Sequence, residues 1–321
     1  MAELVESVHA SLPASADDVD LLPVRTGTVR TWRTLRSNPL FWVGSVIAGT
    51  MILAGVLAPL VAPYGPTQEF RDLMPLSGDA LGPTEQFPLG TDRVGRDYLS
   101  RLLYGATTSL VIGIGANLIA AVIGLAVGAT AALAGSPSFG LAGRRLAVPV
   151  ESVLMRLTDL WLSMPILLLT ITLAFVVGNS VGLVIAIIGT TLWTGMARLV
   201  YGRLLVLRES EFVDASRALG SSARRVFVRH LVPHVLPLLV VYASLGIAAT
   251  ILFEATLAFL GAGVPPPVPT WGSMLSAGTP YIYTDPRLAL LPGLCITLTV
   301  LGFNLLGDAL RDALDPRGWR A

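Results

Sequence analysis

Charged residues are scarce in this chain: they make up 13% of its 321 residues, whereas hydrophobic residues make up 53%. Soluble globular domains carry about 25% charged residues. This shortage of charge argues against a soluble enzyme. It also excludes an intrinsically disordered chain, which combines low hydrophobicity with high charge.

Lysine is absent, and only one cysteine, Cys295, is present. Without lysine the chain cannot contain the G-x-x-x-x-G-K-[ST] loop that cradles nucleotide phosphates. One cysteine cannot form a disulfide framework or a multi-thiolate metal site. All 22 basic residues are arginines, and the net charge of +1 provides no basic surface for nucleic acid.

Long stretches without Asp, Glu or Arg indicate where the chain crosses a membrane. A helix needs about 20 predominantly apolar residues to span the hydrocarbon core of a bilayer. The sequence predicts an all-α membrane protein in which residues 38–321 form the transmembrane domain and residues 1–37 a polar cytoplasmic tail. The six transmembrane helices are expected at about 41–62, 108–134, 154–177, 181–201, 236–260 and 288–307.

The arginines are distributed unevenly between these predicted helices. If the N-terminus is cytoplasmic, 17 arginines lie in cytoplasmic segments and 5 in external segments. Lys and Arg are enriched in cytoplasmic loops of membrane proteins. We therefore expect both termini and the loop at about 202–235 in the cytoplasm, and the segments at about 63–106 and 262–286 outside.

The cytoplasmic loop has the pattern of two short helices joined by a glycine. Four residues recur at i, i+3, i+4 and i+7 and so share one helix face: Phe212, Ala215, Ser216 and Leu219. Gly220 stands where a helix C′ glycine is expected, and Ser221 could cap a second helix. Helices of about ten residues need packing partners in water. Two interpretations stay open: a hairpin lying on the membrane, and a docking element for a cytosolic protein.

The same loop resembles the EAA motif of ABC importer permeases, which reads Glu-Ala-Ala, three residues, Gly, nine residues, Ile-x-Leu-Pro. The chain keeps the alanine, the glycine and the proline of that motif at the family offsets, as Ala215, Gly220 and Pro233. It departs from the motif at four positions: Asp214, Ser216, His230 and Val232.

Three further segments resemble the oligopeptide/dipeptide branch of that family, in its C-type subunit. They are Leu-Gly-Thr-Asp-Arg-Val-Gly-Arg-Asp at 89–97, the stretch 254–275 and the C-terminal stretch 304–317. The four matches occur in the family order and cover most of residues 38–317.

The resemblance implies the permease subunit of an ATP-binding-cassette importer that moves di- or oligopeptides across the bacterial inner membrane by alternating access. It implies a homologous B-type permease, two cytosolic ATPases that bind ATP and Mg, and an extracytoplasmic peptide-binding protein. The chain itself would bind membrane lipid but no cofactor, metal or nucleic acid, and would catalyse no reaction. Residues 209–233 would couple it to the ATPases through Glu211, Asp214, Ala215, Ser216, Leu219, Gly220, Arg224 and Pro233. Similar systems carry nickel, glutathione or glycosylated peptides, so the cargo stays open.

Five other residues are candidates for the translocation path or for contact with the binding protein: Thr91, Asp92, Arg96, Glu254 and Trp271. The first three also suit local turns and ion pairs. Glu254 lies in the fifth predicted helix, where a structural hydrogen bond or ion pair is the favoured role. Trp271 follows a proline-rich outer loop that either lines the path or faces the binding protein, or else anchors the membrane interface through its aromatic residues.

Two other classes of function also fit an all-helical membrane protein. A proton-coupled secondary transporter would show internal repeats with broken helices at matching positions, and the sequence shows no such repeat. A membrane-embedded enzyme would need a cluster of catalytic residues in its helices, where only isolated ionisable residues occur. Co-purification of an ATPase distinguishes the importer from both.

Overall fold

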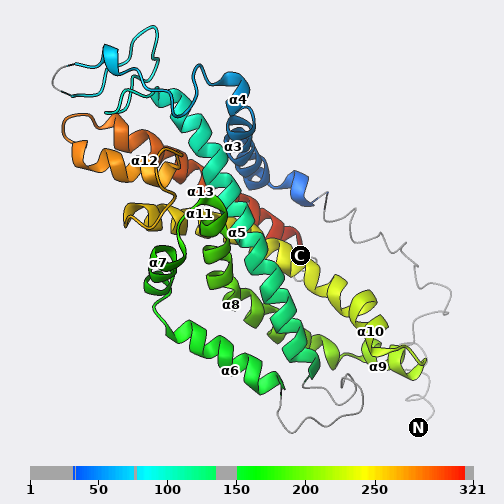
Figure 1. Cartoon of the computed structure of the whole chain (residues 1–321). Helices are drawn as coiled ribbons and strands as arrows, with labels where there is room; N and C mark the ends of the chain where they lie inside the picture. The colour runs from blue at the N-terminus through cyan, green and yellow to red at the C-terminus, as the bar shows by residue number, and fades with distance from the viewer. Residues whose placement is uncertain (1–31, 33, 76–77, 135–149, 315–321) are drawn as a thin grey trace, which may run out of the picture.

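The protein is described from a computed structural model, which covers residues 32, 34–75, 78–134 and 150–314. Long helices run alongside one another through this part of the chain (Figure 1), and its only β-structure is two isolated bridges. Five helical segments are long and apolar enough to cross a membrane, and a bent pair could form a sixth crossing. The prediction of an all-α membrane protein is confirmed for these residues, with five to six candidate spans.

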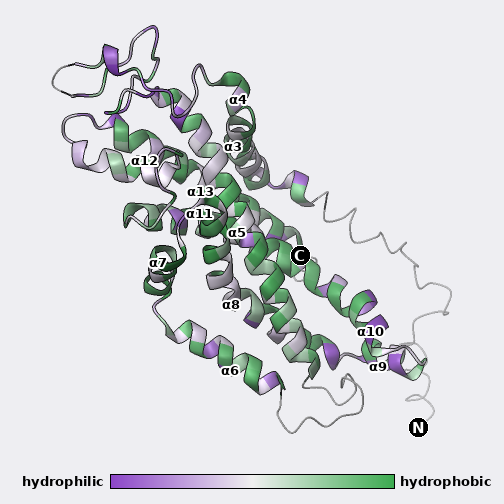
Figure 2. Cartoon of the chain, in the orientation of Figure 1, coloured by the Kyte–Doolittle hydropathy of each residue, from purple (hydrophilic) through white to green (hydrophobic). Residues whose placement is uncertain are grey.

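The membrane-length helices are α3 (Pro39–Val56), α5 (Tyr98–Ala134), α8 (Val181–Arg208), α11 (Val232–Phe259) and α13 (Arg287–Leu314). Hydrophobic residues run along the middle of these helices, and hydrophilic residues gather toward their ends (Figure 2). This distribution is typical of membrane-spanning helices, because charged side chains are energetically costly in the hydrocarbon core.

The third predicted helix, 154–177, is not continuous. It is divided into α6 (Val150–Ser163) and α7 (Ile166–Val177), which meet at 87° across Met164 and Pro165. Proline has no backbone N–H and disfavours the helical conformation of the residue before it. The sequence therefore ends one helix and starts another at a point that hydropathy alone does not reveal.

Two other helices extend beyond their predicted limits. α5 begins at Tyr98 rather than near residue 108, and α8 continues to Arg208 rather than ending near residue 201. The added turns carry arginines, so a search for charge-free stretches stops before the helix does. With a rise of about 1.5 Å per residue, the 37 residues of α5 extend over about 55 Å, well beyond a hydrocarbon core of about 30 Å.

Glycines allow α5 and α8 to pack closely. A Cβ atom on Gly124 would lie 2.5 Å from the Cβ of Met196, and one on Gly128 would overlap the carbonyl oxygen of Ala197. Helices associate in lipid through such small-residue contacts, because lipid tails provide no hydrophobic driving force between them. The α5–α8 pair is thus a close-packed centre for the fold.

Short elements occupy the two ends of this bundle. α9 (Glu211–Ala218), α10 (Ala223–Val226) and a π-helical turn, η3 (Phe227–Leu231), lie at one end, and α12 (Trp271–Gly278) lies at the other (Figure 1). The end with α12 also holds α4 (Ala58–Val61), η1 (Arg71–Leu73) and η4 (Thr279–Tyr281). The predicted tail falls mainly at 1–31, outside the described residues.

Candidate functional site

Gly220 forms the sharp turn between α9 and α10. Its φ of +81° lies in the left-handed region, which residues with a Cβ atom seldom adopt. The N–H of Gly220 donates to the Arg217 carbonyl at 2.8 Å, and the N–H of Ser221 donates to the Ser216 carbonyl at 3.1 Å. These two bonds satisfy the last carbonyls of α9 in a Schellman motif. The predicted C′ glycine is confirmed.

The second helix of the hairpin is capped one residue later than expected. The hydroxyl of Ser222, not Ser221, accepts a hydrogen bond from the N–H of Arg225, at 3.4 Å. Ser221 is not available as the cap because its backbone closes the end of α9. In the turn, Gly220 therefore provides the left-handed backbone, the N–H of Ser221 closes the end of α9, and the Ser222 hydroxyl caps α10.

One face of the hairpin is buried against the long helices. Val213 of α9 and Val226 of α10 are fully buried in one cluster with Leu204 and Leu207 of α8 and with Leu231 of η3. Burying such side chains stabilises each by about 1.5–3 kcal/mol. The hairpin is thereby fixed to the ends of α8 and α11 and has to move with them.

The opposite face of α9 is largely exposed within the part of the chain that the structure describes. Leu219 is 87% exposed and Phe212 is 38% exposed, and the ring of Phe212 stacks on that of His234 at 5.1 Å. We call this face, made of Phe212, Ala215, Ser216 and Leu219, the α9 surface. The other predicted coupling residues are also exposed: Glu211 and Asp214 of α9, Gly220 of the turn, Arg224 of α10 and Pro233 of α11. An exposed leucine and a partly exposed phenylalanine on one face are suited to contact with another protein.

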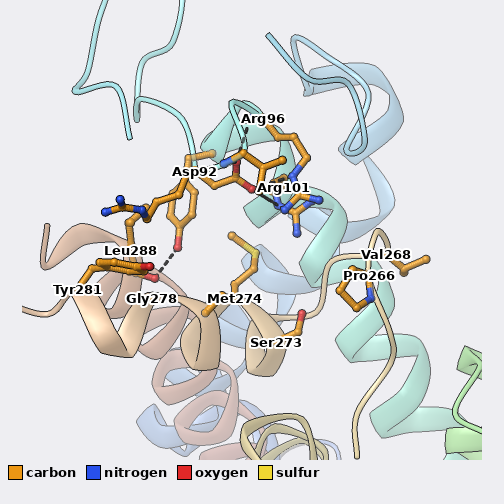
Figure 3. Close-up of a pocket in the computed structure, with 14 residues that line it drawn as sticks. Asp92, Arg96, Arg101, Pro266, Val268, Ser273, Met274, Gly278, Tyr281 and Leu288 are labelled. Atoms are coloured by element: carbon orange, nitrogen blue, oxygen red, sulfur yellow. Dashed lines mark hydrogen bonds and ion pairs between the residues drawn. The ribbon is translucent and has the colours of Figure 1, made fainter. Parts of the chain in front are cut away.

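A cavity of about 280 Å³ lies at the other end of the bundle. Segment 92–101, the loop at 266–268 and α12 form its walls, and Figure 3 shows Asp92, Arg96 and Arg101 on one side and Met274 of α12 facing them. The structure thus brings together two predicted site residues, Asp92 and Arg96, and joins to them Arg93 and Arg101.

Asp92 organises the charged side of this cavity. One carboxylate oxygen, Oδ1, accepts hydrogen bonds from the backbone N–H groups of Val94 and Arg96, both at 2.9 Å. The other, Oδ2, lies 2.8 Å from Arg96 and 3.4 Å from the Nε of Arg101. Arg101 also donates to the carbonyl of Pro66 at 2.9 Å. This network holds both guanidinium groups in place while their side chains remain only 13% and 8% exposed.

Sequence reasoning missed Arg93 and Arg101. The available signal was their density: three of the five external arginines fall between residues 93 and 101. Arg93 lies with its guanidinium carbon 4.1 Å from the ring centre of Tyr281 and pairs with Asp79 at 3.2 Å.

Thr91 and Trp271 are structural in this conformation. Thr91 is fully buried, and its hydroxyl accepts a hydrogen bond from the N–H of Leu81 at 3.0 Å. Trp271, at 1% exposure, donates its indole N–H to the carbonyl of Leu102 at 3.1 Å. The Trp271 ring therefore packs in the core of the described chain.

Glu254 of α11 lacks the partner that the sequence led us to expect. The side chain is 1% exposed, and neither carboxyl oxygen makes a hydrogen bond within the described part of the chain. The Thr270 hydroxyl interacts with the carboxyl group but does not reach hydrogen-bond geometry. A buried polar group without a partner is destabilising, so Glu254 is a strained point of the fold.

Residues 138–320 match the family described as the inner membrane component of binding-protein-dependent transport systems, and residues 28–80 match the N-terminal transmembrane domain of oligopeptide transport permease C. The chain belongs to this permease family. It is 36% identical over 314 residues to a Brucella suis biovar 1 chain named as a peptide permease, covering 97% of this permease and 98% of that chain. It is also 36% identical over 296 residues to the dipeptide transport system permease protein DppC of Alkalihalophilus pseudofirmus. That alignment covers 90% of this permease and 91% of the DppC chain.

The permease also shares its fold with a solved structure. A chain of the inward-facing MetNI methionine ABC transporter superposes with a TM-score of 0.51 over 67% of the permease and 96% of that chain, at 21% identity. Family membership and the apolar helices together make this permease a multi-pass protein of the bacterial inner membrane. Membership also implies that it works with ATPase and further permease subunits.

Proposed function

We propose that this permease imports di- or oligopeptides by alternating access, driven by two cytosolic ATPases that dock on the α9 surface. The uncovered α9 surface on a hairpin fixed to α8 and α11 is the observation that carries this proposal. A peptide cargo is supported by relatives that are named as peptide and dipeptide permeases. Nickel, glutathione or another small peptide-like solute is the alternative cargo.

Both termini and residues 202–235 are cytoplasmic in this proposal, and segments 63–106 and 262–286 are outside. The arginine distribution of 17 to 5 supports this orientation. The α9 surface and the charged cavity lie at opposite ends of the long helices, so one end would face the ATPases and the other an extracytoplasmic binding protein.

Coupling follows from the way the hairpin is held. When ATP brings the ATPases together, a force on α9 is transmitted through Val213 and Val226 to the buried ends of α8 and α11. Helices packed this closely shift as rigid bodies rather than deform. ATP and Mg would bind to the ATPases, and this chain would contribute no phosphate loop. A homologous permease would complete the path.

The test is co-purification of the ATPases with a variant of the α9 surface. Leu219→Glu places a charge on the most exposed apolar position of α9 and should abolish ATPase retention and peptide uptake, while expression and membrane insertion persist. Tyr283→Glu, at a position 98% exposed at the opposite end, is the matched control and should retain both.

Normal ATPase retention with Leu219→Glu would reject the docking role of this surface. Hydrolysis of ATP by the purified permease alone would reject the subunit assignment itself.

A further inference from the structure

We propose that the charged cavity is a binding site for the terminal carboxylate of a short peptide, held by Arg93, Arg96 and Arg101. This inference rests on the proposed peptide cargo and adds a site within the permease, separate from the pocket of any binding protein.

Charge favours an anion in this cavity. Three arginines and a single carboxylate, Asp92, line it. Asp79, which pairs with Arg93, is 63% exposed and does not belong to the lining. The lining therefore carries an excess of positive charge at a place where two of the guanidinium groups are largely shielded from water. Shielding strengthens the attraction for an incoming negative group.

Unused donors are available on these arginines. Arg96 uses Nε and Nη2 on Asp92, and Arg101 uses Nε on Asp92 and Nη1 on the carbonyls of Pro66 and Pro267. Nη1 of Arg96 and Nη2 of Arg101 make no hydrogen bond to any residue that the structure describes. Two fixed guanidinium groups with free N–H donors match the two oxygens of a carboxylate.

Apolar side chains beside the arginines favour a ligand that has an apolar group next to its carboxylate. Met274 and Leu288 are buried in the wall, and Val94, Pro266 and Val268 lie along the opening (Figure 3 labels all but Val94). A carboxylate next to an apolar side chain is what the last residue of a peptide presents. The volume of about 280 Å³ is at the lower end of small-ligand pockets, which suits one or two residues rather than a long segment.

A peptide end suits this site better than an acidic side chain of a docked protein. The Arg101 side chain is only 8% exposed, and the buried side chains of Met274 and Leu288 belong to the same lining. An acidic side chain on a folded surface would bring polar backbone with it against that wall.

The experiment uses the assembled transporter in lipid nanodiscs without the binding protein, with alanyl-phenylalanine and its C-terminal amide as probes. We expect the free acid to bind, by ligand-observed NMR, with a Kd at least about tenfold lower than the amide. Arg93→Gln should weaken binding of the acid about tenfold and leave the amide unchanged. Arg71→Gln, which removes an external arginine that is 74% exposed and outside the cavity, should change neither.

A second variant covers the case in which Arg93→Gln loses its fold. Arg101→Lys keeps the positive charge but removes the planar guanidinium group. It should weaken binding of the free-acid peptide while the ATPases still co-purify with the permease. Equal binding of acid and amide, or no binding of either by an assembled transporter, would overturn the site. So would weaker binding of the receptor protein to Arg93→Gln with unchanged peptide binding, because the carboxylate would then belong to the receptor. Normal peptide uptake alongside any of these results leaves the proposed import function standing.

Discussion

Gly220→Val tests the α9–α10 turn most directly, because the structure isolates one physical effect. A Cβ atom at this position would meet no atom of the described residues within 4 Å, so the position has room for a side chain. The whole penalty comes from placing a β-branched residue at φ +81°. Left-handed backbone costs such a residue about 1–2 kcal/mol.

That penalty corresponds to a factor of about 5–30 in the equilibrium constant between the correctly folded and the distorted hairpin. The strain is relieved when the two hydrogen bonds that close α9 break, and α9 then tilts away from α10. Because membrane insertion does not depend on this turn, expression should persist. The apparent Kd for the ATPases should rise, by at most the same factor, because it varies inversely with the fraction of correctly folded hairpin.

A graded series sharpens this prediction. Asn adopts left-handed backbone more readily than other residues with a Cβ, so Gly220→Asn should retain most ATPase binding, Gly220→Ala less, and Gly220→Val least. Gly182→Val is the control: it adds the same side chain at a helical position of α8 where a Cβ also meets nothing within 4 Å. The assay is titration of the ATPases onto the purified permease. Equal binding by all three Gly220 variants would refute the role of the turn.

Four further predictions follow from the same structure. In a Cys295→Ala background, an impermeant maleimide should label Asp79→Cys in intact cells and Ser222→Cys only after permeabilisation. Gly128→Ala should lower the unfolding temperature in detergent, because its Cβ overlaps the α8 backbone, at a cost of about 1–3 kcal/mol. Glu254→Gln should raise that temperature, because a neutral amide is less costly to bury without a partner than a carboxylate. The purified permease should release no phosphate from ATP, because it has no lysine for a phosphate loop.

These four predictions have the following controls and refuting results. Gly49→Ala, where a Cβ meets nothing within 4 Å, should leave the unfolding temperature unchanged or raise it. Labelling of Ser222→Cys in intact cells would reverse the orientation. A lower unfolding temperature for Glu254→Gln would show that the carboxylate has a stabilising partner in the assembled transporter. Phosphate release above a vector control would contradict the last prediction.

The membrane helices and the α9–α10 turn could be predicted because their causes are local in sequence. Charge-free stretches mark the hydrocarbon core, since a charged side chain there is costly wherever the rest of the chain lies. Gly220 was predicted from its offset to α9, since the left-handed conformation that ends a helix depends on a few adjacent residues. The same local reasoning missed the 87° break at Pro165, because a proline within a membrane helix is often tolerated.

The candidate site depended on contacts between segments far apart in the sequence. Arg101 lines a cavity because its helix lies beside the loop at 266–268, and Trp271 is buried because α12 packs against α5. Among the described residues the Glu254 carboxyl group makes no hydrogen bond because of what surrounds it in space, which its neighbours in sequence do not specify. The sequence by itself thus determined the membrane helices and the glycine turn that ends α9, since hydropathy and turn geometry act over short range. Only the tertiary structure decided which polar side chains face a cavity and which face the core, since that choice depends on the packing of distant helices.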